Sequence, residues 1–232
     1  MEPKIEFEKK ANGLLWPYYQ GQKARSSSSL VKILKKIEYA DKQIPERILL
    51  IAAKNGELFH QVIQDFFVQT GLEPSYLTSL KASPKLLNKL QKTICFLEKN
   101  EQLLSSRCLV GTEKLHYTFY KDTLIATYVD LEFTDFIVEL KTNNVIMHES
   151  PLTRLSFQIQ LLIQHLCTKK DVYLLWSTEN KVIFHKFQIS DNLLKVLDIL
   201  IDLVKKTDQY TLLEKRKIVE KILNDYSPCR LF

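Results

Sequence analysis

Hydrophobic residues recur at helical spacing in the first half of the chain. After Gly56 the apolar positions are Phe59, Val62, Ile63, Phe66 and Phe67, which follow the i, i+3, i+4, i+7 pattern of one helix face. A glycine at Gly71 stops this pattern, and Pro45 fits the first turn of an earlier helix. The sequence predicts helices at about 29–41, Pro45 to Ala53, Gly56 to Gly71 and Pro84 to about Asn100.

The period changes after residue 112, where short runs of Tyr, Thr, Phe, Val and Ile alternate with polar residues. We expect strands at about 113–120, 123–132 and 136–141, a helix from Pro151 to Cys167, a hairpin of Val172–Trp176 and Val182–Phe187, and helices at about 191–206 and 210–225. This order predicts an α/β fold with a mixed central β-sheet flanked by helices.

The N-terminal residues 1–28 are predicted to be irregular, and the serines of Ser26–Ser29 are placed to cap the first helix. The length of 232 residues suits one domain. We expect a single domain over 29–232, with a helical part at 29–105, a sheet core at 106–188 and C-terminal helices at 189–232.

Composition excludes several classes of protein. The longest apolar run, Ile48 to Ala53, has six residues, so no membrane span is expected, and the N-terminus lacks the apolar stretch of a secretory signal. The five glycines form no phosphate-binding loop, and the four cysteines form no CxxC pair. We expect an intracellular protein with free thiols. The net charge of +6 weakly favours a polyanionic partner.

Three charged residues on two predicted strands form the main candidate for chemistry. If Thr134–Asp135 is a two-residue turn, Asp130 lies opposite Glu139, and Lys141 shares the face of Glu139. Two adjacent carboxylates favour a hard cation such as Mg²⁺ or Mn²⁺. The alternative is a set of solvated acids at a hairpin mouth with Lys141 as a surface partner.

Two weaker features accompany this group. His60 flanks the apolar stripe of its helix, and Gln160 and Gln164 lie one helical turn apart on one face. Alone, such a histidine is more often structural than a ligand, and such glutamines usually form a polar helix surface.

The order of these elements resembles the RecB-like branch of the PD-(D/E)XK nucleases. The resemblance rests on Gly56–His60 as GxxxH, Tyr128–Asp130 on a strand, Val138–Thr142 as the ExKT strand, and a glutamine-bearing helix, within residues 26–188. Mitochondrial genome-maintenance exonucleases and phage-type exonucleases are both similar. The resemblance implies a restriction-endonuclease-like core and Mg²⁺- or Mn²⁺-dependent hydrolysis of DNA, most readily by an exonuclease in replication, repair or recombination.

The resemblance also implies roles for individual residues. His60, Asp130, Glu139 and the backbone carbonyl of Leu140 would bind the metal, and Lys141 would orient the attacking water and stabilise developing charge.

More peripheral roles follow in the same way. Glu113 would contact a second metal or a metal-bound water, and Gln160 would contact the site or the nucleic-acid backbone. Gln164 stands where the family has tyrosine and is a second candidate for substrate binding, and Gln158 is a rival for the family glutamine. Arg25 and Ser29 are candidates for a terminal phosphate, against the helix-cap interpretation of the serines.

The chain lacks the clustered cysteines that hold an iron–sulfur cluster in some relatives, so none is expected. The expected partners are DNA ends, single- or double-stranded, together with replication or recombination proteins, and the expected location is cytoplasmic or nucleoid-associated, with a viral or organellar origin left open. Two alternatives remain: a non-catalytic nucleic-acid-binding protein with a nuclease-like fold, and a structure-specific endonuclease.

Overall fold

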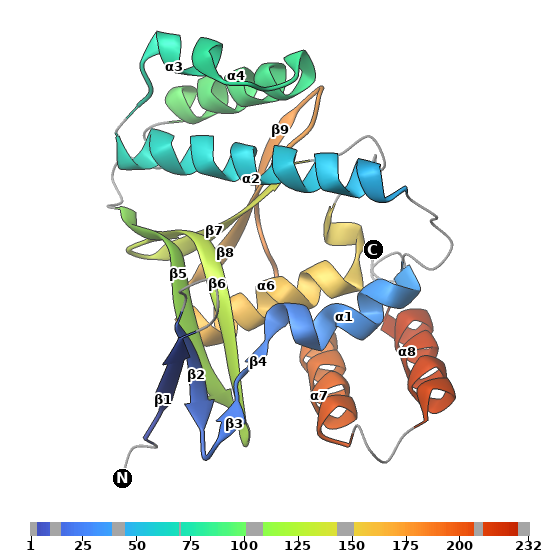
Figure 1. The fold of residues 1–232 in the computed structure, drawn as a ribbon. Helices are drawn as coiled ribbons and strands as arrows, with labels where there is room; N and C mark the ends of the chain where they lie inside the picture. Colours follow the sequence, from blue (N-terminus) through green and yellow to red (C-terminus); the bar gives the residue numbers. More distant parts are fainter. Residues whose placement is uncertain are drawn as a thin grey trace.

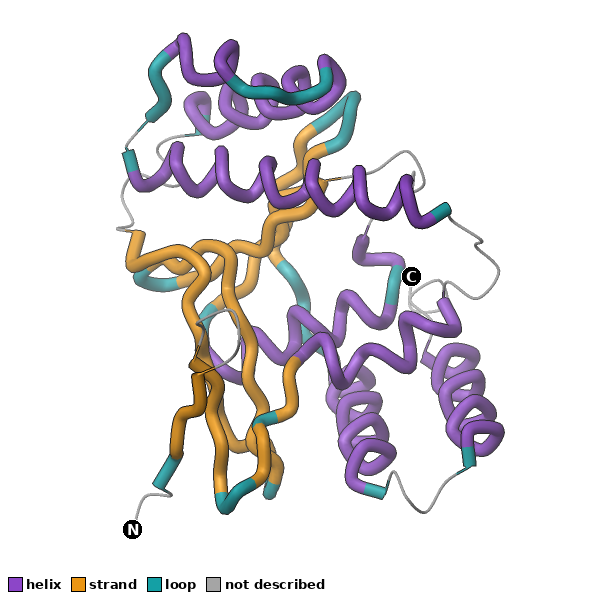
Figure 2. The backbone as a smooth tube through the Cα atoms, in the orientation of Figure 1, coloured by secondary structure: helices purple, strands orange, loops and turns teal. Residues whose placement is uncertain are grey.

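A computed structural model describes residues 4–9, 15–38, 45–69, 71–100, 109–142, 151–206 and 211–226. Its strands lie between two groups of helices (Figure 2). The predicted fold class, an α/β fold with a mixed sheet flanked by helices and a restriction-endonuclease-like order of core elements, is confirmed. Among the described helices, none is long and apolar enough to cross a membrane.

The central sheet has six strands in the order β4-β6-β7-β8-β9, with β5 paired to β6. The β7–β8 and β4–β6 pairs are parallel and the others are antiparallel. The strands are β4 (Arg25–Ser26), β5 (Leu109–Tyr120), β6 (Thr123–Phe133), β7 (Phe136–Thr142), β8 (Asp171–Ser177) and β9 (Val182–Lys186). The predicted β6–β7 register is confirmed at two pairs, Leu131 with Val138 and Glu132 with Ile137, but among the described residues the pairing does not extend to the predicted pair of Asp130 and Glu139.

Two groups of helices cover the central sheet (Figure 1). One group packs through the core that contains Ile137 and Leu174, and the other through the core that contains Leu140 and Leu175. The first group is α1 (Ser27–Glu38), α6 (Leu155–Thr168), α7 (Asp191–Lys205) and α8 (Leu212–Tyr226); the second is α2 (Glu46–Val68), α3 (Pro74–Ser79) and α4 (Pro84–Lys99).

The expectation of an irregular segment over 1–28 is corrected by the structure. β1 (Glu6–Lys9), β2 (Leu15–Tyr19) and β3 (Gln22–Lys23) form a separate antiparallel sheet, and β4 joins the central sheet. Trp16 is buried against Leu124 and Ala126 of β6, and its indole N–H donates to the carbonyl of Ala24 at 3.0 Å. These strands are too short to show a clear alternation in sequence, and burial against β6 stabilises them.

The two helices predicted on either side of Gly56 form one continuous helix, α2, of 23 residues. A glycine inside a helix costs about 1 kcal/mol relative to alanine, which is small beside the burial of Phe59, Val62 and Ile63 on the same helix. The short helix α3 was not predicted, and the helix expected to begin at Pro151 begins with a 3₁₀ turn (Pro151–Thr153) before α6.

Candidate active site

The site lies where the central sheet forks. β6 pairs with β7 only at Leu131 and Glu132, and with β4 only at Ile125 and Ala126. One edge of β6 pairs with β5. The opposite edge of β6 pairs with both β4 and β7, and, among the described residues, 127–130 lie between them without a strand partner on that edge. Side chains, rather than a neighbouring strand, can therefore reach the backbone there.

The strand is also irregular at Asp130. Val129 packs in the core with α6, whereas Leu131 packs in the core with α2, although regular alternation would place both on one face. On the neighbouring strand Glu113 has a φ of 48°, which is unusual for a residue other than glycine. Local irregularities of this kind redirect side chains, and this one lets Asp130 reach His60 of α2.

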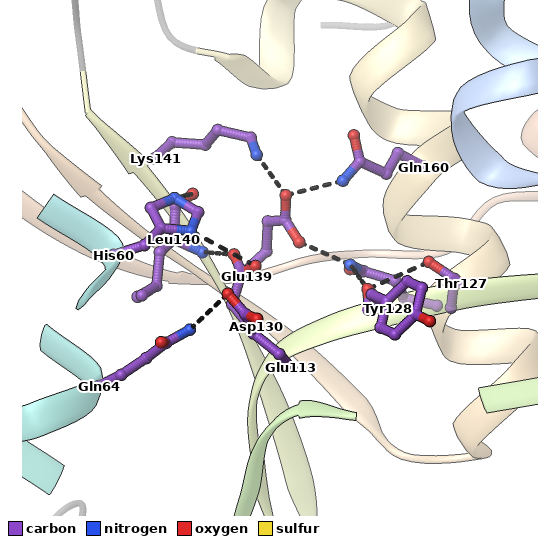
Figure 3. A network of polar contacts seen from close by, with 11 residues as sticks. His60, Gln64, Glu113, Thr127, Tyr128, Asp130, Glu139, Leu140, Lys141 and Gln160 are labelled. Atoms are coloured by element: carbon purple, nitrogen blue, oxygen red, sulfur yellow. Dashed lines mark hydrogen bonds and ion pairs between the residues drawn. The ribbon is translucent and has the colours of Figure 1, made fainter. Parts of the chain in front are cut away.

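Asp130 connects α2 to β7 (Figure 3). Its Oδ2 accepts a hydrogen bond from the backbone N–H of Leu140 at 2.7 Å, and its Oδ1 lies 3.6 Å from Nδ1 of His60. The Nε2 of His60 lies 3.0 Å from the carbonyl oxygen of Leu140. The structure therefore brings together three of the predicted metal ligands: an imidazole, a carboxylate and a backbone carbonyl.

Glu139 faces the other way, toward α6. Its carboxylate is buried and accepts from Lys141 and from the amide of Gln160 at 2.7 Å through Oε1, and from Gln164 at 2.6 Å through Oε2. Gln164 is fully buried and also donates to the carbonyl of Tyr128 at 3.2 Å, inside the fork. The two glutamines that the sequence suggested as substrate contacts thus hold Glu139 in this structure.

Lys141 is held at the same carboxylate. Its Nζ also lies 5.3 Å from the ring centroid of Phe157, within range of a cation–π interaction. Burial alone would lower the pKa of Lys141, but the attraction of Glu139 and Asp130 outweighs it and raises the pKa. Lys141 therefore carries a positive charge and can donate hydrogen bonds.

The carboxylates differ in their preference for a proton. Burial, followed by repulsion from Glu139, raises the pKa of Asp130 to about 8. Burial also acts to raise the pKa of Glu139, but Lys141 and the amide of Gln164 outweigh it and lower the pKa. The pKa of His60 is lowered, first by burial and then by Lys141. Without a cation, the surroundings of the site therefore favour the ionised form of Glu139 and the protonated form of Asp130.

Two residues extend the network beyond the predicted set. Gln64 of α2 donates to Glu113 at 3.4 Å, and the charge of Glu113 adds to the raised pKa of Asp130. Gln64 follows His60 by four residues, so the helical spacing placed both on one face, and that spacing was the available signal in the sequence. Tyr128 is the second addition, and it contributes a backbone carbonyl that the sequence pattern gave no reason to select.

The predicted terminal-phosphate residues lie beside the fork, where β4 pairs with β6 at Ile125 and Ala126. Arg25 is on β4, and no contact joins it or Ser29 to this network among the described residues. The backbone N–H of Ser29 donates to Oγ of Ser26 at 3.0 Å, which is the helix-cap arrangement. Glu132 is also separate from the site: its carboxylate is 2.7 Å from Nζ of Lys170 and 3.1 Å from Nε2 of His116.

The donor atoms fit a hard divalent cation in kind. The carboxylate of Asp130, the imidazole of His60 and the carbonyl of Leu140 converge, and oxygen and nitrogen atoms of these kinds bind divalent cations. In the described ranges no three His, Cys, Asp or Glu side chains already form a metal-binding cluster. Glu139 accepts two donors on Oε1 and one on Oε2, which leaves one acceptor position on Oε2 among the described contacts.

Comparisons with known proteins give weak structural similarity. No protein-family model matches the sequence, and no curated protein matches it at a significant level. A proposed exonuclease from Eubacterium rectale matches with a TM-score of 0.46 and 12% identity, over 87% of this chain and 82% of that one. An alkaline exonuclease from Laribacter hongkongensis matches with a TM-score of 0.39 and 10% identity, over 90% and 95%. Neither match is close enough to assign an activity.

Proposed function

We propose that this chain is a metal-dependent nuclease of the PD-(D/E)XK type that hydrolyses phosphodiester bonds in DNA. The observation that carries the proposal is the arrangement of charged groups at the fork of the sheet. Asp130 contacts His60 and the backbone of Leu140, and the next residue to Leu140 on each side, Glu139 and Lys141, form an ion pair. Carboxylates that can bind a divalent cation, together with a positively charged lysine, suit the hydrolysis of an anionic ester.

The proposed division of labour follows the two sides of the network. Asp130, His60 and the carbonyl of Leu140 would hold Mg²⁺ or Mn²⁺, and Glu139 would complete the set. When bound, the metal supplies Lewis-acid stabilisation of the phosphate and lowers the pKa of the attacking water. Lys141 orients that water and donates a hydrogen bond to the charge that develops on the phosphate.

The glutamines of α6 have a supporting part in this proposal. Gln160 and Gln164 fix the direction of the Glu139 carboxylate, so that Lys141 stays near the scissile bond. Exonuclease action, the RecB-like branch and a role with replication or recombination proteins come from the sequence resemblance alone. These three statements are the more specific part of the proposal.

The test is digestion of DNA labelled at either end, single- and double-stranded, with each end blocked in turn. Wild-type protein is expected to degrade DNA with Mg²⁺ or Mn²⁺ and to be inactive in EDTA. Lys141→Ala should lose activity, whereas Lys99→Ala, which removes an exposed lysine at the far end of α4, should retain it. Equal activity of wild type and Lys141→Ala would contradict the catalytic assignment.

One observation favours a non-catalytic nucleic-acid-binding protein as the second candidate. Three nitrogen donors among the described residues contact the carboxylate of Glu139, so its charge is compensated without a metal. This candidate predicts that DNA binds but is never cut, and that Mg²⁺ does not raise the unfolding temperature. Release of internal fragments from end-blocked DNA would instead indicate an endonuclease.

A further inference from the structure

A pocket that is separate from the proposed catalytic site lies on the opposite side of β7 from Lys141. It is formed between the first half of α2, the start of α4, the end of β7 and the β8–β9 turn. In Figure 1 the β8–β9 hairpin reaches toward α4, and Nζ of Lys92 donates to the carbonyl of Glu179 in that turn at 2.5 Å. The pocket is thus held between elements that are also joined by direct contact.

The polar groups of this pocket favour an anion. Among the described lining residues, Lys85 and Lys89 of α4 are opposed by one carboxylate, that of Glu179, which lies 3.6 Å from Nζ of Lys85. The lining therefore has one positive charge in excess. The N-terminus of α4 adds partial positive charge, since Ser83 caps this helix and also lines the pocket.

Two further features point to a bound group. Lys89 is only 8% exposed, and burial lowers its pKa, so an anion nearby would stabilise its charged form. The hydroxyl oxygen of Thr142 is buried and has no hydrogen-bond partner among the described residues. Thr142 lines the pocket and is a donor that an anion can use, because a buried hydroxyl without a partner is costly.

The pocket and the proposed catalytic site share two elements, β7 and α2. Thr142 directly follows Lys141 on β7. On α2 the lining residue Asn55 precedes His60 by five residues, which is roughly 7.5 Å along the helix axis. Apolar side chains of Ile48 and Ile51 form another wall, which can contact a sugar without competing for the charge.

We propose that this pocket binds a phosphate of the nucleic-acid strand, next to the phosphodiester at the Asp130–Lys141 site. The inference rests on the proposed function, because it takes the polyanion to be the substrate strand. The lysines and the α4 N-terminus attract the phosphate, and Thr142 donates to it. The pocket therefore sets the position of the strand, and Lys141 acts on the adjacent bond.

The test measures binding without cleavage. A single-stranded oligonucleotide with a 3′ fluorophore, with or without a 5′-phosphate, is titrated with full-length protein in EDTA at several salt concentrations, and anisotropy gives the affinity. Lys89→Met keeps the aliphatic stem and removes the charge, and Lys99→Met makes the same change on exposed α4 surface. Lys85→Gln and Thr142→Val serve as second variants if Lys89→Met proves unstable by thermal unfolding.

Loss of one phosphate contact should reduce the slope of log K against log salt by about 0.7 for a single strand. Lys89→Met or Lys85→Gln should show this reduction and weaker binding, Thr142→Val weaker binding, and Lys99→Met neither. A loss confined to the 5′-phosphorylated strand identifies a terminal phosphate, and an equal loss with both strands identifies an internal one. Wild-type slopes and affinities in the pocket variants, or no binding by wild type, would overturn the inference.

This result is separable from the digestion assay. Unchanged binding by the pocket variants together with Mg²⁺-dependent digestion refutes the pocket and leaves the nuclease proposal intact. Altered slopes without any digestion support the pocket in a protein that binds nucleic acid and does not cut it.

Discussion

The carboxyl of Asp130 offers the sharpest test of the site in the absence of metal. Its ionised form is disfavoured by burial and by Glu139, which raise its pKa to about 8. Asp130→Asn keeps the size of the side chain, and the new carbonyl oxygen can still accept from the N–H of Leu140. The substitution therefore removes the titrating group while preserving its main contact.

The sign and size follow from proton linkage. Between the ordinary value of 3.8 and about 8, folded protein keeps a proton on Asp130 that the unfolded chain releases. The contribution of Asp130 to stability is present below the ordinary value and is lost as pH rises toward the folded value. The slope is at most about 1.4 kcal/mol per pH unit, so from about pH 5 to about pH 7 wild type loses roughly 2–3 kcal/mol that Asp130→Asn keeps.

Thermal unfolding in EDTA at several pH values measures this difference. For a chain of this size, the Tm of the variant should rise relative to wild type by roughly 4–12 °C over that interval. Asp135→Asn, which changes an exposed turn carboxylate in the same hairpin, is the matched control and should follow wild type. If the Tm of wild type and the Tm of Asp130→Asn changed in parallel with pH, a raised pKa of Asp130 in the folded protein would be refuted.

Three other outcomes are expected. Lys141→Met should reduce Mg²⁺-dependent hydrolysis by about 100-fold or more with DNA binding in EDTA retained, as checked by digestion rate and anisotropy. Gln164→Leu leaves Glu139 without one buried donor and should lower the free energy of unfolding in urea by about 1–3 kcal/mol, whereas exposed Gln61→Leu should change it little. His60→Ala should reduce the rise in Tm on adding Mn²⁺, and an unchanged rise would exclude His60 as a ligand.

The local pattern of the sequence was enough to place the central hairpin. A two-residue turn at Thr134–Asp135 gave the register of β6 and β7, whereas the faces of β6 did not follow regular alternation, which breaks at Asp130. Because cross-strand neighbours depend only on that register, Asp130 and Glu139 could be placed on adjacent strands before the fold was known. The helical spacing of His60 with Phe59, Val62 and Ile63 likewise predicted that it lies beside a buried face.

Other features depend on contacts between segments that are distant in sequence. The small sheet of β1–β3 is stabilised by packing of Trp16 on β6, and α2 continues through Gly56 with Phe59, Val62 and Ile63 buried on the C-terminal side of that residue. Local propensity alone favours a break at such a glycine and gives no strong signal for such short strands.

The direction of each carboxylate was also settled by the tertiary structure. Glu139 meets Gln160 and Gln164 of α6, and Asp130 meets His60 of α2, so the two acids of one hairpin face different helices. The sequence determined which residues stand next to one another along two paired strands. Only the packing of helices against the fork in the sheet decided which donors compensate each charge, because buried charges take the partners that the surrounding fold supplies.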